Sequence, residues 1–350
     1  MPQLILRLKR FMSDHSDWNR GCDFRVLFVS GHWSAKANRP CAGIFVDRQL
    51  ASLKKKGIEM ATFDVGRSHN PFSLFRKWIK LQKLIKRFQP HLVHGQYGTM
   101  IGFLAAFSGA PSVISFCGSD LLPGASVSWV RMYLGFLLSN LAALRANKII
   151  CKSQELRNAL WWKKNEAVVI PNGVDLDMFS PGSQDEARRK LDWKMDCPVV
   201  LFYVGQDERN KGLDIAKASM EIVQKKIPKA ELCIFSKVEP DQMPLYYRAG
   251  DVLLCASRQE GSPNVVKEAL ACNLPIVSSL VGDVGERLTG VFPSEVVARS
   301  PQAMGEALIR VLGYRRRSNG RDSVAALSLE VIAKRVLDVY QSCGCTNLSK

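Results

Sequence analysis

The segment between residues 251 and 286 constrains the fold more than any other part of the chain. It begins with a short apolar run, Val252 to Ala256, which predicts a buried strand, and continues through a polar turn into a stretch with helical apolar spacing. Ser262 and Pro263 stand where that helix would start, with a hydroxyl at the cap and a proline at the first helical position. A second apolar run, Ile276 to Ser278, follows the helix. Strand, loop, helix and strand in this order predict a parallel crossover unit.

The start of this helix is a candidate site for an anion. A helix that begins just past the carboxyl end of a parallel strand presents free N–H groups and about half a positive charge, which suit a phosphate. Two carboxylates flank the point, because Glu260 lies ahead of the helix and Glu268 lies about one and a half turns into it. They are placed to accept hydrogen bonds from sugar or ribose hydroxyls; the alternative is an ordinary crossover with a solvated Glu268. The backbone expected around a diphosphate is that of Gly261, Ser262, Pro263, Asn264, Val265 and Val266.

Glu260 and Glu268 are separated by seven residues in the run EGSPNVVKEALACNLPIV. This run resembles the Glu-x7-Glu motif of the family 4 retaining glycosyltransferases of the GT-B fold, and the following VGDVGE is similar to that family's next loop. The resemblance implies an α/β protein with two Rossmann-like domains facing a cleft, and a C-terminal helix that crosses back to the N-domain. It also implies transfer of a sugar from a nucleotide diphosphate sugar with retained anomeric configuration, without a metal or other cofactor.

The resemblance assigns roles to particular residues. Glu268 would accept the ribose hydroxyls, and Glu260 would hold sugar hydroxyls near the reacting carbon. The loop GQDERNKG is similar to the family's phosphate-binding Gly-Arg…Lys-Gly segment, in which Gly205 and Lys211 match. Gln206 stands where the family has arginine, so we expect Arg209 to reach the diphosphate in its place. Donors fixed at the leaving diphosphate would lower the barrier as charge develops there.

The first half of the chain carries further loops that resemble the family's cleft loops. Gly43 opens a helix after the strand Arg25 to Ser30, and the run PSVISFCGSDLLPG places Cys117 where the family usually has histidine beside the donor sugar. A thiol is a poorer hydrogen-bond donor than imidazole. Asp120 and His94 are therefore candidates for work near the reacting carbon, although a structural role for His94 is an equal alternative.

A length of 350 residues suits two domains. The run PNGVDLDMFSP resembles the family's interdomain linker, and its Gly and Pro mark a boundary on independent grounds. The second domain should be small, because only about ten residues stand where the family inserts a strand, a helix and a strand. The expected units are an extension at 1–24, an acceptor-side domain at 25–175, a nucleotide-sugar-binding domain at 176–326, and a crossover helix with tail at 327–350.

The net charge of +17 arises from 49 basic and 32 acidic residues. Nucleic acid, an anionic membrane surface or an anionic substrate could each explain it, and composition does not choose. Leu74 to Phe88 predicts a basic amphipathic helix whose apolar face, including Phe75, Trp78 and Leu81, packs on a sheet. Its basic side would then be free to contact anionic lipid. We expect a membrane surface and no nucleic acid as partner, and residues 127–144 to form a buried or membrane-grazing helix.

The N-terminal run MPQLILRLKRF is too short in its apolar part for a signal peptide and lacks a cleavage site. We therefore expect a cytoplasmic protein, peripheral on the inner face of the membrane, acting on a saccharide or lipid-linked precursor of a surface polysaccharide. Ten scattered cysteines indicate reduced thiols, and no zinc spacing is present. The rival hypotheses are a nucleotide-sugar epimerase on the same fold and a catalytically degenerate basic protein that binds nucleic acid or lipid.

Overall fold

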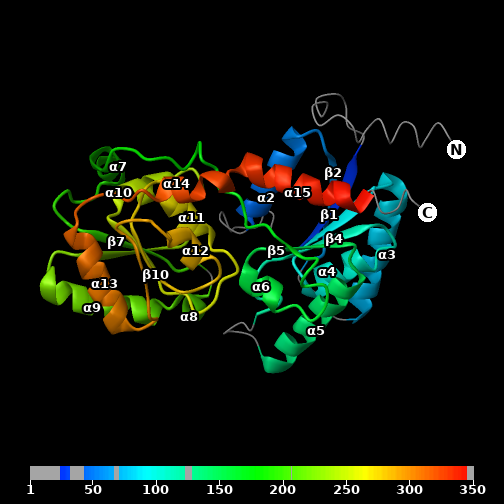
Figure 1. Ribbon diagram of the computed structural model, residues 1–350, viewed down its shortest axis with the longest axis horizontal. Helices are drawn as coiled ribbons and strands as arrows, with labels where there is room; N and C mark the ends of the chain where they lie inside the picture. Colours follow the sequence, from blue (N-terminus) through cyan, green and yellow to red (C-terminus); the bar gives the residue numbers. More distant parts are fainter. Residues whose placement is uncertain (1–23, 32–42, 67–70, 123–127, 206, 345–350) are drawn as a thin grey trace.

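The computed structural model describes residues 24–31, 43–66, 71–122, 128–205 and 207–344. These residues form two α/β halves, each built on a sheet of parallel strands (Figure 1). The first sheet has the order β2-β1-β3-β4-β5-β6 and the second the order β11-β10-β9-β7-β8. The strands of the first sheet are β1 (Arg25–Ser30), β2 (Glu59–Asp64), β3 (Leu92–Gln96), β4 (Ser112–Phe116), β5 (Lys148–Cys151) and β6 (Val168–Val169). Those of the second are β7 (Val199–Tyr203), β8 (Glu231–Phe235), β9 (Val252–Cys255), β10 (Ile276–Ser279) and β11 (Glu295–Val297).

Helices cover both faces of each sheet. Those of the first half are α2 (Ile44–Lys55), α3 (Pro71–Phe88), α4 (Thr99–Ala106), α5 (Trp129–Arg145) and α6 (Gln154–Asn158). Those of the second half are α7 (Gln184–Leu191), α8 (Glu208–Lys211), α9 (Leu213–Lys226), α10 (Met243–Ala249), α11 (Asn264–Ala271), α12 (Val284–Leu288), α13 (Pro301–Gly313) and α14 (Gly320–Val324). A 3₁₀ turn, η1 (Ala325–Leu327), then leads into α15 (Leu329–Gly344).

Successive side chains of a strand point to opposite faces, and this alternation divides the core. In β7, Val200 and Phe202 pack in one buried cluster with α9 and α13, whereas Leu201 packs in another with α10 and α11. The runs are apolar on both faces, as expected for a parallel sheet covered on both sides. The segment between 251 and 286 therefore folds as the predicted crossover, with β9 and β10 paired in parallel.

One buried cluster continues from one half into the other. It includes Val26 of β1, Leu253 of β9 and Ile332 of α15. The chain leaves the second half through Ser328, which forms a bridge with Val174 of the linker, and α15 then runs back along the first half beside α2 (Figure 1). The predicted C-terminal helix that crosses back is confirmed.

The surface helices depart from prediction in one respect. Leu81 of α3 is fully buried, but Phe75 and Trp78, which the apolar spacing assigned to the packed face, are 59% and 39% exposed. The packing of α3 on the sheet uses its C-terminal half, where Leu84, Ile85 and Phe88 contact the core. In α5 the buried residues lie in the second half of the helix, and Trp129 near its start is exposed. Within the described ranges, no helix combines the length and apolar character needed to cross a bilayer.

Candidate functional site

The order of the second sheet reverses between β7 and β9, and ligands of open α/β sheets bind at the carboxyl ends of strands beside such a point. The loops that follow these two strands are joined there, because Asn210 Nδ2 donates to the carbonyl of Gln259 at 2.9 Å and Arg258 N donates to the carbonyl of Asn210 at 2.7 Å. The segment after β7 that carries Lys211 and the turn after β9 that carries Glu260 thus form one surface.

Lys211 and Glu260 meet on this surface. Lys211 Nζ lies 2.5 Å from Glu260 Oε1, and Ser257 Oγ donates to the same oxygen at 2.9 Å. Burial acts to lower the pKa of Lys211, but the carboxylate of Glu260 outweighs it, so that the pKa is raised and the lysine stays charged. Each side chain keeps slightly less than a fifth of its surface exposed. Lys211 is therefore a charged side chain held in a fixed position by its ion pair with Glu260.

The start of α11 differs from the prediction. Pro263 occupies the cap position and the helix begins at Asn264, one residue later than expected. The Ser262 hydroxyl does not cap the helix, because it accepts a hydrogen bond from Lys267 Nζ at 2.8 Å and donates one to Asp283 Oδ2 at 2.9 Å. A buried lysine needs acceptors, and this need overrides the local capping preference of serine. Asn264 and Val265, at the first turn, are half-buried, whereas Val266 faces the core.

Glu268 is 8% exposed and lies where the two halves meet. Arg48 of α2 in the first half donates to its Oε1 at 3.0 Å, and the Tyr247 hydroxyl donates to its Oε2 at 3.0 Å. Burial raises the pKa of Glu268, and Arg48 and Tyr247 offset part of that rise. The solvated Glu268 of the alternative interpretation is excluded. Each carboxylate oxygen keeps one lone pair for a further donor.

The loop that contains Cys117 lies directly against the start of the Glu-x7-Glu segment. A Cβ added to Gly261 would stand 2.0 Å from the carbonyl oxygen of Cys117, and one added to Gly282 would stand 2.5 Å from that of Gly261. Real Cβ atoms do not approach a backbone oxygen so closely, so glycine is required for this contact. Three loops from both halves of the chain, which hold Cys117, Gly261 and Gly282, are therefore stacked backbone on backbone.

Asp120 and His94 are buried beneath this contact. Asp120 is 1% exposed, and its carboxylate accepts hydrogen bonds from the amides of Gly98, Cys117 and Gly118 at 2.7–3.1 Å. It holds the Cys117 loop in shape. His94 is fully buried, with Nδ1 2.5 Å from the Tyr340 hydroxyl. Burial, with the nearby charge of Lys152, lowers the pKa of His94 to about 3, so the ring is neutral.

The remaining predicted residues are less closely gathered. Arg209 is exposed on α8, one residue beyond Glu208 and two before Lys211. Gly205 has a φ of 60° and lies next to Lys211, since its added Cβ would stand 3.3 Å from Lys211 Cε. Gly43 is buried at the cap of α2 with a φ of 86°. Gln206 lies outside the described residues.

Residues that sequence reasoning missed include Arg48, Lys152 and Lys267. Arg48 of the first half binds Glu268 of α11, and Lys267, itself on α11, binds Ser262 and the carbonyl of Asn172. Lys267 gave one signal, because it is a charged residue close to the apolar residues Val266 and Ala269 of a predicted helix. In the part of the chain that the structure describes, no three His, Cys, Asp or Glu side chains gather closely enough to hold a metal ion.

Comparisons with known proteins agree with this architecture. Residues 19–178 match the family described as Glycosyltransferase Family 4, and residues 235–313 match Glycosyl transferases group 1. A D-inositol 3-phosphate glycosyltransferase of Segniliparus rotundus is 29% identical over 210 residues, which are 50% of this chain and 46% of that protein. Sucrose-phosphate synthase of Thermosynechococcus elongatus superposes with a TM-score of 0.76 at 20% identity, covering 92% of this chain and 100% of that one. HepE of Anabaena, in complex with UDP-glucose, gives a TM-score of 0.68 at 15% identity, covering 91% and 99%.

Two parallel Rossmann-like sheets with a returning C-terminal helix define the GT-B class of fold, as the sequence predicted. The chain belongs to glycosyltransferase family 4, group 1. Its matched region spans about half the length of the curated relatives or slightly less.

Proposed function

We propose that the protein is a retaining glycosyltransferase that moves a sugar from a nucleotide diphosphate sugar to an acceptor. The observation that carries the proposal is the meeting of Lys211, Glu260 and the start of α11 at the switch point of the second sheet. A charged lysine beside free helix N–H groups supplies two independent attractions for a diphosphate. The Cys117 loop of the first half closes over the same point.

In this mechanism each residue acts on one part of the donor. Lys211 and the backbone of Gly261 to Val266 stabilise the leaving diphosphate, with Arg209 reaching in from α8. Glu260, held by Lys211 and Ser257, accepts hydrogen bonds from hydroxyls of the transferred sugar. Glu268 offers its remaining lone pairs to the ribose hydroxyls, while Arg48 and Tyr247 keep its carboxylate in place. Asp120 acts by holding the loop of Cys117 against the sugar.

A set of nucleoside diphosphates tests this proposal by thermal shift, because a ligand at 100 times its dissociation constant adds about 2.7 kcal/mol of stability. We expect one base to stabilise the protein clearly. The matching nucleotide sugar is then incubated alone and with a membrane lipid extract. Release of nucleoside diphosphate that requires the extract supports transfer. Conversion of the sugar without an acceptor would instead support an epimerase, and no stabilisation by any nucleotide would support a binding protein.

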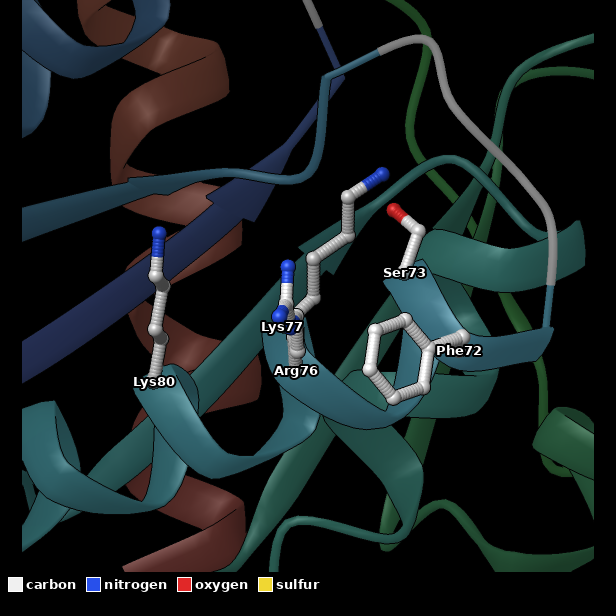
Figure 2. Close-up of a pocket in the computed structure, with 5 residues that line it drawn as sticks. All are labelled: Phe72, Ser73, Arg76, Lys77 and Lys80. Carbon is white, nitrogen blue, oxygen red and sulfur yellow. The ribbon is translucent and has the colours of Figure 1, made fainter.

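The acceptor is proposed to be a saccharide or lipid-linked precursor at the inner, cytoplasmic face of a membrane. Support comes from α3, where five residues line a hollow of about 250 Å³ that opens to solvent (Figure 2). Phe72 is 65% exposed, and the Arg76 guanidinium lies 4.4 Å from the centre of its ring. Phe75 and Trp78 stack on each other while exposed. Exposed aromatic rings among basic side chains are typical of helices that lie in a lipid interface.

Co-sedimentation with anionic vesicles tests the membrane proposal. The double variant Lys80→Gln, Lys83→Gln should bind less at low salt, since each basic residue near the surface contributes about 1 kcal/mol. The control, Lys225→Gln with Lys226→Gln, removes the same charge from exposed positions on α9 in the other half. An equal loss of vesicle binding in both variants would mean that net charge alone attracts the vesicles. Absence of binding by the wild type would contradict the membrane proposal.

A further inference from the structure

Lys152 is a buried lysine whose side chain has no acceptor in the part of the chain that the structure describes, and its burial lowers the pKa of the ammonium group. It follows β5 directly, is 0% exposed, and its Nζ has no hydrogen-bond partner among the described residues. The nearby carboxylate of Asp120 is occupied by three backbone amides. Burial raises the pKa of the neighbouring thiols of Cys117, to about 12, and Cys151, so neither supplies a negative charge. A buried charge is costly unless it is paired, so this lysine requires an explanation.

The surroundings of Lys152 are polar and lie at the edge of the sheet that faces the second half. Lys152 N donates to the carbonyl of Phe116, which places it beside Cys117 at the ends of β5 and β4. Gln96, at the end of β3, donates to Cys117 Sγ at 3.5 Å, and its Oε1 is buried without a partner in the described part of the chain. Gln96 thus ends β3, and Cys117 and Lys152 directly follow the adjacent strands β4 and β5; Gln96 and Lys152 each have an unused polar atom.

A second buried lysine approaches from the other half. Lys267 is 1% exposed, and its Nζ donates to the carbonyl of Asn172 at 3.0 Å as well as to Ser262. Burial lowers the pKa of Lys267 to about 8; the nearby carboxylate of Asp283 opposes this shift, and the charge of Lys152 adds to it. The side-chain oxygen of Asn172 is also buried without a partner among the described residues. Ser262, which Lys267 binds, follows Gly261, whose backbone stacks on Cys117 beside Lys152, so the two lysines of opposite halves border the same contact.

We propose that Lys152, with Lys267 beside it, binds the carboxylate of a uronic-acid residue, and that Gln96 Oε1 accepts one of its hydroxyls. This inference rests on the proposed function, in which the diphosphate is already held by Lys211 and the start of α11. Lys152 belongs to the first half, on the side of the Cys117 loop, where the sugar would lie. A neutral hexose leaves Lys152 without an anion in hydrogen-bond contact, whereas a hexuronic acid brings one carboxylate, and a charge-assisted hydrogen bond to it is strong when water is excluded.

The experiment compares ligands that differ only in the carboxylate. Calorimetry first identifies the nucleoside diphosphate that binds. The nucleotide-linked glucose and glucuronic acid are then titrated, and free glucose and glucuronate are titrated into the complex with nucleoside diphosphate. Preference in the first pair assigns the carboxylate to the donor, and preference only in the second assigns it to a separate sugar. We expect a preference for the acid of about 30-fold or more in one pair, as for other buried charge pairs.

Two variants separate a binding role from a structural one. Lys152→Met should lose the preference for the acid, keep the affinity for the bare nucleoside diphosphate, and melt at a higher temperature, because a buried unpaired charge has been removed. Lys148→Met, at the other end of β5, should change none of these. Equal binding of acid and neutral sugar by the wild type in both pairs, or a preference that survives in Lys152→Met, would overturn the inference. Failure of every nucleoside diphosphate to bind would instead count against the proposed function.

Discussion

Substitution of Arg48 by methionine should destabilise the protein strongly, because it breaks a buried ion pair that joins the two halves. Arg48 Nη1 and Glu268 Oε1 are 3.0 Å apart, and their side chains are only 14% and 11% exposed. The arginine also contacts Met178 and lies 5.1 Å over the ring of Phe179. Removing one partner of such a pair costs about 3–5 kcal/mol, since the other charge stays buried. We expect the lower end, about 3 kcal/mol at neutral pH, because Tyr247 still donates to Glu268.

The pH dependence follows from the same carboxylate. Burial raises the pKa of Glu268, and loss of Arg48 raises it further. The folded state of Arg48→Met then binds a proton at a higher pH than the unfolded state, so its stability falls as the pH rises through that interval. Acidification from pH 7.5 toward pH 5 should therefore recover part of the loss relative to the wild type.

Urea unfolding, followed by tryptophan fluorescence, measures these differences. The double variant Arg48→Met, Glu268→Gln should recover much of the loss, because no buried charge remains. Lys56→Met is the control, since it breaks another ion pair between distant segments, with Glu330, that is largely exposed; no measurable change is expected there. A loss below about 1 kcal/mol in Arg48→Met, or a double variant no more stable than the single one, would refute the reasoning.

Two further predictions concern the contact between the halves and the buried histidine. Gly261→Ala should weaken nucleoside diphosphate binding and expand the protein in small-angle scattering, because the new Cβ meets the Cys117 carbonyl at 2.0 Å; Gly313→Ala, which meets nothing within 4 Å, should do neither. Unchanged scattering and affinity in Gly261→Ala would contradict the stacked loops. His94, with its pKa lowered to about 3, takes up a proton at a higher pH in the unfolded state than in the folded state, so its contribution to stability should fall by about 1.4 kcal/mol per pH unit below pH 6. His94→Asn should show a shallower slope between pH 6 and pH 4, and identical slopes would contradict a buried neutral ring.

Local sequence signals predicted much of the fold. The apolar runs of β9 and β10, the intervening helix and the Gly and Pro of the linker each constrain the backbone within a few residues, so they can be recognised without tertiary information. The same is true of the loops that place Lys211 and Glu260 at neighbouring strand ends, because parallel strands present their carboxyl ends on one edge.

The sequence-based predictions failed where packing between distant segments determines the position of a side chain. Arg48 and Glu268 are 220 positions apart, and no local sequence pattern predicts that they form an ion pair. Ser262 followed the capping rule locally but is engaged by Lys267 and Asp283. Helical spacing assigned Trp78 to the packed face of α3, yet the sheet beneath reaches only the later turns of that helix. Hydrophobic periodicity predicts the apolar face of a helix, but it does not predict how much of that face the sheet covers.

Calorimetry of nucleoside diphosphate binding to the wild type and to Lys211→Met tests the central claim most directly. The variant removes the positive charge that is paired with Glu260 and proposed to hold the diphosphate, so we expect binding to weaken by about 30-fold or more. Lys225→Met, at an exposed position of α9, should bind as the wild type does. Equal affinity of Lys211→Met and wild type for the bound nucleotide would contradict the account.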